Sequence, residues 1–183
     1  MSTWSWSWTG WGLAALLLFW GIGAYNRLMS LRNAIATAFA QLDEHMTARA
    51  LMCGRLIALL RPLLPSEQAT FDTLEAAQAE AQTAAQSVRV RPHASDPVAS
   101  LAVASALHAA ALTRLMSMLE HHASLREDVA LYALVDELKL IERQRSFARQ
   151  VFNQAVTVYN TAVTQFPTRI LASLYGFSES RSL

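Results

Sequence analysis

The N-terminal segment constrains this 183-residue chain most, because the first 26 residues carry no charged side chain and Arg27 is the first. The segment holds all five tryptophans and four of the six glycines. A helix that crosses a bilayer needs about 20 apolar residues, and residues 8–25 supply 18 uncharged ones. At a rise of about 1.5 Å per residue, this run is about 27 Å long, close to the thickness of the hydrocarbon core. We therefore expect residues 1–26 to form an N-terminal tail and transmembrane anchor.

The residues that we expect to anchor the chain are apolar or aromatic, and rings of tryptophan and tyrosine favour the membrane interface. They are Trp8, Trp11, Leu16, Leu17, Leu18, Phe19, Trp20 and Tyr25. A cleaved signal peptide is the rival interpretation, because the apolar core 11–24 is short and ends in a small residue. Signal peptides begin with a positively charged region, and no Lys or Arg precedes this core. A buried core helix is the third interpretation, but Trp-Ser-Trp-Ser-Trp would be an odd solvent-facing start. An uncleaved anchor fits the sequence best.

Charges near the anchor predict its orientation. Arg27 and Arg32 follow the anchor, whereas only the α-amino group precedes it. Positive side chains gather on the cytoplasmic side of membrane helices. We therefore expect the N-terminus outside and residues 27–183 in the cytoplasm.

The composition argues against several classes of function. The chain has 15 Lys and Arg against 14 Asp and Glu, without a basic stripe, so we expect no nucleic-acid partner. Cys53 is the only cysteine, which excludes an intramolecular disulfide and argues against a cysteine-based zinc site. The five histidines lack the spacing of a metal motif, and a chain with two glycines beyond the anchor has no glycine-rich phosphate loop. We therefore expect no catalytic, cofactor-binding or metal-binding residue.

Prolines divide the rest of the chain into long helical segments, because proline breaks a helix interior. The five prolines lie within 62–65, 92–97 and at 167. Between them the chain is rich in good helix formers such as Ala, Leu, Gln, Glu and Arg. The predicted helices are 28–63, 66–88, 97–120 and 126–166, followed by a short amphipathic segment that ends at Gly176. The fold class that we expect is all-α, with an N-terminal transmembrane helix continuing into an elongated antiparallel four-helix bundle. The bundle would span 27–177, and 178–183 would be a C-terminal tail.

Apolar residues at three- and four-residue steps predict the buried face of each helix. In the first helix they are Leu28, Leu31, Ile35, Phe39, Leu42, Met46, Cys53, Leu56, Leu60 and Leu63. In the third they are Leu101, Ala104, Leu107, Leu112, Leu115 and Leu119, after a predicted start with Asp96 as the cap and Pro97 at the first helical position. In the fourth they are Val135, Leu138, Ile141, Ala148, Phe152, Val156, Tyr159, Val163 and Phe166. The first stripe stays in phase with the anchor, so we expect one continuous helix.

Two arginines interrupt these stripes. Arg49 and Arg145 occupy positions where an apolar residue is expected, and a buried charge needs a partner. Asp43, Glu137 and Glu142 are the candidate partners. We interpret the arginines as a polar network that fixes helix register, with a site for a small anion as the alternative.

A repeat in the fourth helix has a seven-residue spacing. Phe152-Asn153 and Tyr159-Asn160 fall on one helix face. We predict packing and interhelical hydrogen bonds there, with a recognition surface as the sharper alternative.

A series of short elements in the chain resembles the LemA family. It begins with Tyr25-Asn-Arg-Leu-Met-Ser-Leu-Arg-Asn33 after the anchor and ends with Phe166-Pro167 and Gly176-Phe177. The matching residues are Tyr25, Asn26, Leu28, Leu31, Arg32, Asn33, Leu42, Asp43, Arg49, Glu137, Leu138, Glu142, Ala148, Arg149, Asn153, Tyr159, Asn160, Phe166, Pro167, Gly176 and Phe177. Residues 64–125 carry little of the likeness, and Gly54-Arg55 stands where the family usually has Pro-Asn. The resemblance implies a membrane-anchored bacterial protein with an elongated helical bundle, and it implies no activity.

These observations lead us to expect a single-pass protein of the bacterial inner membrane that is a non-enzymatic scaffold or interaction module. Its partners would be the lipid bilayer and one or more proteins, which coiled-coil-like helices would contact. The alternative is a membrane-organising structural protein that acts by self-association as a homo-oligomer. An enzyme with an unrecognised site is the third hypothesis.

Overall fold

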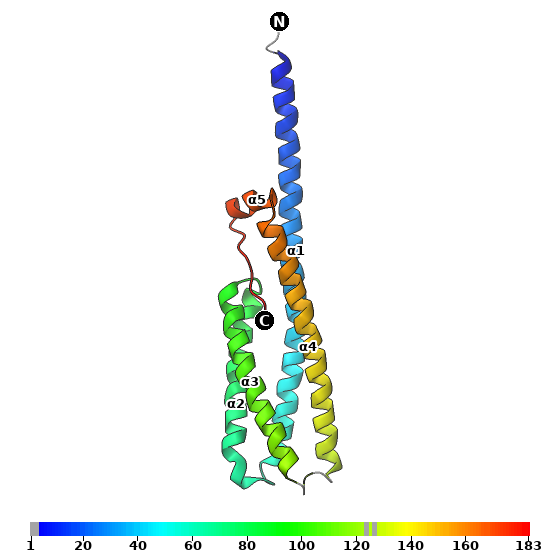
Figure 1. The fold of residues 1–183 in the computed structure, drawn as a ribbon, viewed down its shortest axis with the longest axis vertical. Helices are drawn as coiled ribbons and strands as arrows, with labels where there is room; N and C mark the ends of the chain where they lie inside the picture. Colours follow the sequence, from blue (N-terminus) through cyan, green and yellow to red (C-terminus); the bar gives the residue numbers. More distant parts are fainter. Residues whose placement is uncertain (1–3, 123–124, 126–127) are drawn as a thin grey trace.

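The computed structural model describes residues 4–122, 125 and 128–183. In this part of the chain the elements are α1 (Trp4–Leu60), the 3-10 helix η1 (Pro65–Glu67), α2 (Gln68–Val90), α3 (Ser95–His121), α4 (Val129–Thr164) and the short α5 (Thr168–Leu174), and there is no strand. The four long helices run alternately down and up, and the N-terminal part of α1 projects far beyond the others (Figure 1). The predicted all-α fold with an elongated antiparallel bundle is confirmed.

Helix α1 is continuous from the projecting segment into the bundle, as its unbroken apolar phase predicts. It ends at Leu60, and the amides of Leu63 and Leu64 both donate to the carbonyl of Leu60 as the chain turns toward α2. This turn makes the prediction for Leu63 wrong, because its side chain is exposed and Leu64 packs into the core instead.

Helix α3 begins two residues earlier than predicted, with Ser95 first and Ala94 in the cap position. Asp96 lies in the first turn and does not cap the helix. Pro97 falls within the same turn, where the missing amide hydrogen costs nothing because the first four amides of a helix have no partner inside it. The prediction for Leu107 is also wrong, since its side chain is exposed and His108 takes the inward position.

Helix α4 begins at Val129, and Arg126, the predicted start, lies outside the described residues. The carboxylate of Asp128 caps the helix, accepting hydrogen bonds from the amides of Ala130 (2.9 Å) and Leu131 (3.1 Å). At the other end the chain leaves the helix at Gln165, ahead of the cis Phe166-Pro167 bond. Phe166 is therefore exposed, and its predicted place in the buried stripe is wrong.

The apolar core of the bundle has two halves. Helix α1 packs mainly against α4 and helix α2 mainly against α3, and the two pairs together enclose the core. The half beside the projecting part of α1, here called the anchor-side half, contains Ile35, Phe39, Phe152 and Tyr159 among others. The half at the opposite end, here called the far half, is built from residues such as Leu56, Leu60, Phe71 and Leu115. A polar layer around Arg49 separates them.

Among the described residues, two helices are long and apolar enough to cross a membrane, by length and composition alone. One is α1, in which the apolar window is 6% buried, and the other is α3, in which it is 39% buried. Helix α3 turns its apolar face into the bundle. In α1 all eight predicted anchor residues are exposed, including Trp8 at 75% and Trp11 at 77%. The bundle therefore leaves the apolar surface of the projecting segment uncovered.

Candidate functional site

An ion-pair network crosses the middle of the bundle. Arg49 of α1 is 1% exposed, and its Nη1 donates to Oε1 of Glu142 on α4 at 3.3 Å. Arg145 donates to the same carboxylate through Nη2 at 3.1 Å and through Nε. Two arginines thus share one glutamate, and Glu142 is one of the three candidate partners that the sequence offers.

The other two acidic candidates lie elsewhere. Asp43 receives two hydrogen bonds from Arg89 of α2, at 2.8 Å from Nε and 2.9 Å from Nη2. This paired contact joins α1 to α2 near the anchor-side half. Glu137 is exposed on α4 and takes no part in the ion pairs of the described residues. Glu142 is therefore the partner of Arg49 in the polar layer.

Burial and charge act in opposite directions on these groups. Burial and the nearby charge of Arg145 lower the pKa of Arg49, although Glu142 opposes the change. Burial alone would raise the pKa of Glu142, but the hydrogen bond from Arg145 and the charges of both arginines outweigh it and leave that pKa lowered. Glu142 therefore stays ionised in the fold, which the two arginines require.

His108 of α3 faces the same layer and was missed in the sequence. It is 1% exposed, and both ring nitrogens lack a hydrogen-bond partner among the described residues, as do Nε of Arg49 and Oε1 of Gln78. Burial, with the charge of Arg49 added, lowers the pKa of His108 to about 4, so the ring is neutral at pH 7. The signal was its position four residues after Ala104, which continues the three- and four-residue steps through 101, 104, 108 and 112.

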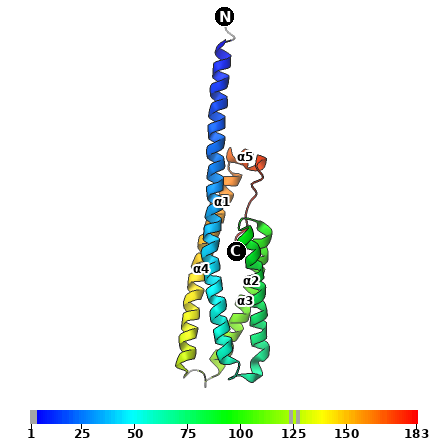
Figure 2. The same cartoon turned by 180° about the vertical axis from the view of Figure 1, so that it is seen from behind.

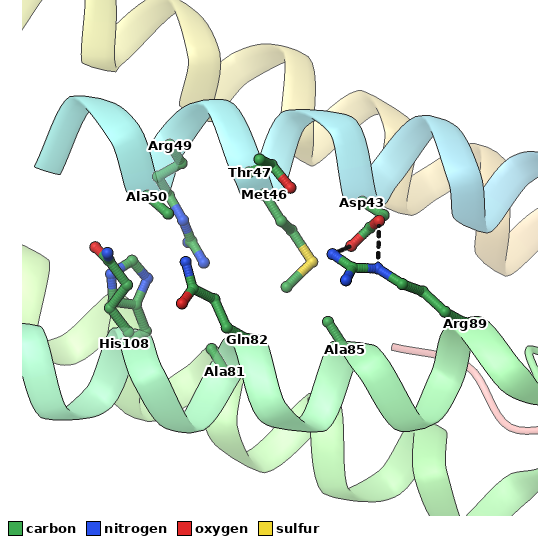
Figure 3. Close-up of a pocket in the computed structure, with 11 residues that line it drawn as sticks. Asp43, Met46, Thr47, Arg49, Ala50, Ala81, Gln82, Ala85, Arg89 and His108 are labelled. Atoms are coloured by element: carbon green, nitrogen blue, oxygen red, sulfur yellow. Dashed lines mark hydrogen bonds and ion pairs between the residues drawn. The ribbon is translucent and has the colours of Figure 1, made fainter. Parts of the chain in front are cut away.

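The layer encloses only a small cavity. Figure 3 shows Arg49 pointing from α1 toward Gln82 and His108 across the gap between the helix pairs. The cavity has a volume of about 20 Å³, which suits about one water molecule. This size favours a network that sets helix register over the alternative of an anion site.

Asn153 and Asn160 of α4 hold the C-terminal segment 178–183 against the bundle. The side-chain amide of Asn160 donates to the carbonyl of Ser180 and its Oδ1 accepts from the amide of Ser180, both at 2.8 Å. Asn153 makes the same pair of bonds with Leu183, also at 2.8 Å. The hydroxyl of Tyr159 adds a bond to the carbonyl of Ser178 at 3.0 Å. The prediction that these residues form interhelical hydrogen bonds is wrong, because their partner is an extended segment.

The spacing of the two asparagines matches this extended partner. Seven helical residues rise about 10.5 Å, and three extended residues span about 10 Å. Asn160 and Asn153 can therefore each meet one backbone unit, at Ser180 and Leu183. Ser95 at the start of α3 holds the segment from the other side, donating from Oγ to the carbonyl of Glu179 at 3.0 Å. Ser180 is 6% exposed as a result.

The two ends of the signature series meet beside α5. The ring of Tyr25 lies 5.2 Å from that of Tyr175 and 5.8 Å from that of Phe177, measured between centroids. The guanidinium of Arg32 lies 5.9 Å from the Phe177 ring centroid. Gly176 has φ of +71°, a conformation that favours glycine, and it ends α5 so that the amide of Phe177 returns to the carbonyl of Ala172 at 2.8 Å. This turn directs the chain into the segment that the asparagines hold.

The remaining signature residues divide between the core and the surface. The buried ones are Leu28, Leu42, Leu138 and Ala148, and Leu31 is partly buried. The exposed ones are Asn26, Asn33, Glu137, Arg149, Phe166 and Pro167.

Side chains that could hold a metal ion do not cluster in the part of the chain that the structure describes. No cluster of three or more His, Cys, Asp or Glu side chains occurs among those residues. Cys53 is fully buried, and burial raises the pKa of its thiol to about 11, which keeps it protonated. Cys53 is therefore a core residue, as its place in the apolar stripe predicts.

Comparison with known proteins assigns the family. No curated protein matches the chain. The LemA family matches residues 38–183. The match includes 64–125, where the resemblance is weakest, and it begins after the Tyr25–Asn33 element, which rests on the resemblance alone. Because the match covers most of the chain and includes the polar layer and the residues that hold the C-terminal segment, this protein belongs to the LemA family.

Proposed function

We propose that this LemA family protein is a membrane-anchored, non-enzymatic interaction module. The proposal rests on one observation, that the two parts of α1 have different surroundings. Its first part exposes a continuous apolar and aromatic surface, from Trp8 to Ile22, that the bundle leaves uncovered. Its second part is a wall of the bundle core. Lipid would cover the first part, since an exposed apolar patch of this extent is costly in water.

The continuity of α1 would make the bundle a rigid extension of the anchor. Residues 27–60 follow without a break in the helix. At about 1.5 Å per residue, they reach about 50 Å from the membrane. The sides of the bundle would thus be presented to other proteins within about 50 Å of the lipid surface.

The apolar anchor is tested by extraction of membranes with alkaline carbonate. The full chain should stay in the pellet, as a spanning helix does. A variant with Leu17→Arg and Phe19→Arg should be released, because each arginine near the centre of a span costs about 3 kcal/mol. Release of the unchanged chain would contradict the anchor.

The orientation that we propose is single-pass in the bacterial inner membrane, with the N-terminus outside and the bundle in the cytoplasm. A Ser182→Cys variant tests it, since position 182 is exposed while the native Cys53 is fully buried. A membrane-impermeant maleimide should label this cysteine only after the cells are permeabilised. The cysteine of a Ser2→Cys variant should be labelled in intact cells, without permeabilisation. Labelling at 182 in intact cells would overturn the orientation.

A surface suited to a partner runs along α4. Leu140, Phe147, Val151 and Val158 follow one another at steps of seven, four and seven residues, and all but the partly buried Val151 are exposed. This spacing is typical of a coiled-coil seam. Beside it lies an apolar groove between α1 and α4, lined in part by Leu31 and Ala38. The seam supports an interaction with a helix of another protein, or with a second copy in the self-association alternative.

Photo-crosslinking from the seam separates these two occupants. A photoreactive residue at Phe147 should give adducts with another protein, while one at the exposed Arg149, on a different face of α4, should not. A homodimer adduct at 147 would favour self-association. Equal yields at the two positions, or none at 147, would contradict the seam as the contact surface.

A further inference from the structure

Helix α5 lies beside α1 where α1 leaves the bundle, as both views show (Figures 1 and 2). Cδ1 of Leu171 is 4.0 Å from the position that a Cβ would take on Gly21. The ring of Tyr175 contacts that of Tyr25. Helix α5 therefore meets α1 between residues 21 and 25, within the segment proposed to span the membrane.

With the proposed anchor and orientation, this level would coincide with the inner edge of the bilayer. A hydrocarbon core about 30 Å thick takes about 20 helical residues. Counted from Trp4, the first residue of α1, such a span ends at Gly23, and counted from Trp8 it ends at Arg27. A helix that touches Gly21 and Tyr25 consequently lies at the boundary between acyl chains and headgroups.

The surface that α5 turns away from the bundle is apolar. Ile170 and Leu174, one turn apart, are 62% and 75% exposed, whereas Ala172 on the opposite side is 1% exposed. Phe166, just before the helix, is 78% exposed. A short helix with large apolar residues outward and a small residue inward has the pattern of a helix that lies in the membrane interface.

A notch between α1 and α5 extends this surface. Its lining includes Leu18 and Ile22 of α1, Leu171 of α5 and the following Tyr175. Its walls are continuous with the proposed anchor, so the material that covers the anchor also reaches the notch. Apolar walls of this kind suit an acyl chain, and their continuity with the proposed anchor favours lipid over a folded protein partner.

Exposed cations accompany the apolar face. Arg169 lies within α5, and Arg27 lies two residues after Tyr25 on α1, and both are exposed. Helix α5 itself carries no acidic residue. Guanidinium groups at this depth match the phosphates of lipid headgroups.

We propose that α5, together with Phe166 and Tyr175, is a second membrane contact, which inserts its apolar face at the acyl boundary while Arg27 and Arg169 bind lipid phosphates. This inference rests on the membrane anchor of the proposed function. The anchor alone would leave the bundle free to tilt. A second contact beside it holds the bundle axis and sets how deeply α1 is inserted.

The test places an environment-sensitive fluorophore on Leu174→Cys in the full chain, reconstituted in vesicles of phosphatidylcholine and phosphatidylglycerol. The native Cys53 is fully buried and stays unlabelled. Lipids with a nitroxide high on the acyl chain should quench the fluorophore at 174 several-fold more than one at Val129→Cys. Val129 is the matched control, because it is 81% exposed and apolar but begins α4 at the far end of the bundle.

A third position separates failure of this proposal from failure of the anchor. A fluorophore on Leu16→Cys should be quenched by nitroxides deep in the acyl chains. Quenching at 16 together with equal, weak quenching at 174 and 129 would overturn the α5 contact and leave the anchor intact. Absence of quenching at 16 would overturn both. Protection of 174 from aqueous iodide without quenching by lipid nitroxides would show a second copy or another protein on α5, and would also overturn the proposal.

The arginines have their own readout. The emission at 174 should shift further to the blue when phosphatidylglycerol is added to phosphatidylcholine vesicles. The double variant Arg27→Gln with Arg169→Gln should lose this additional shift. A shift that persists in the double variant would overturn the assignment of phosphate binding to these two residues.

Discussion

The two halves of the bundle core are built from the same four helices with the same apolar spacing, but different parts of the chain complete them. Apolar side chains fill the far half, from α1 to α4 and the turns between them. The anchor-side half also takes in Phe177 and Leu183, which lie on an extended segment. The segment is neither helix nor strand, so its backbone amides and carbonyls need hydrogen-bond partners from the helix beside it. Asn153 and Asn160 supply them.

The kind of polar residue on an otherwise apolar helix face indicates what kind of partner it meets. Arg49 sits where one half ends and the other begins, and its partner is another side chain. The two asparagines sit within the anchor-side half, and their partner is backbone. An amide group suits backbone because it donates and accepts at once, whereas a guanidinium only donates and suits a carboxylate.

Cavities in either half should cause the largest loss of stability. Phe152→Ala in the anchor-side half and Phe71→Ala in the far half each remove a fully buried ring. Each should lower the free energy of unfolding by about 3–5 kcal/mol. Urea unfolding of the detergent-solubilised chain, followed by circular dichroism, measures this. The exposed Phe147→Ala should change it by about 0.5 kcal/mol or less. Two separate transitions in either variant would show that the halves unfold independently.

Removal of Glu142 should weaken the boundary between the halves. Glu142→Gln leaves Arg49 buried without an ionised partner, which should cost about 3 kcal/mol of unfolding free energy. The matched control is Glu137→Gln on the exposed face of α4. A double variant, Arg49→Met with Glu142→Met, should lose less than the single change, because it removes the fully buried charge of Arg49 together with its partner and leaves only the more exposed Arg145 unpaired. An equal loss in both variants would mean that the layer does not depend on charge pairing.

Acid should act on the same boundary through His108. Its pKa in the fold, about 4, lies below the ordinary 6.5, so the fold favours the neutral ring. The free energy of unfolding that depends on this group is fully present above about pH 6.5. It falls by about 2–3 kcal/mol as the pH drops toward 4, because the unfolded chain takes up the proton first. Urea midpoints measured across it should decline. His108→Leu should flatten the decline, and an unchanged profile in that variant would exclude this histidine as the cause.

Loss of one asparagine should affect only the anchor-side half. Asn160→Ala removes both bonds to Ser180, which should cost about 1–2 kcal/mol and release the segment 178–183. Hydrogen exchange should rise at Ser180 while residues of the far half, such as Leu115, keep their protection. The exposed Gln154→Ala on the same helix serves as the control. Faster exchange throughout the bundle would show that the segment supports the whole fold.

Local sequence patterns predict much of this structure. The unbroken phase of α1, the helix ends near prolines and the inward faces of α1 and α4 follow from periodicity. The failures have local causes. Leu63 and Phe166 lie just beyond a helix end, where periodicity no longer applies. Hydrophobicity favours Leu107 over His108 for the buried face of α3, but the helical position of His108 makes it the buried residue of the two.

The sequence by itself determined the helices, their buried faces, the exposed apolar start of α1 and the need of Arg49 for an acidic partner, because these depend on residues close together along one helix. Only the tertiary structure decided that Glu142 is that partner, that His108 faces it, that Asn153 and Asn160 bind the C-terminal segment, and that α5 lies against Gly21. Each of these contacts joins residues far apart in the chain. Helical periodicity predicts which face of a helix a side chain lies on, and the packing of the other elements decides which residue that side chain contacts.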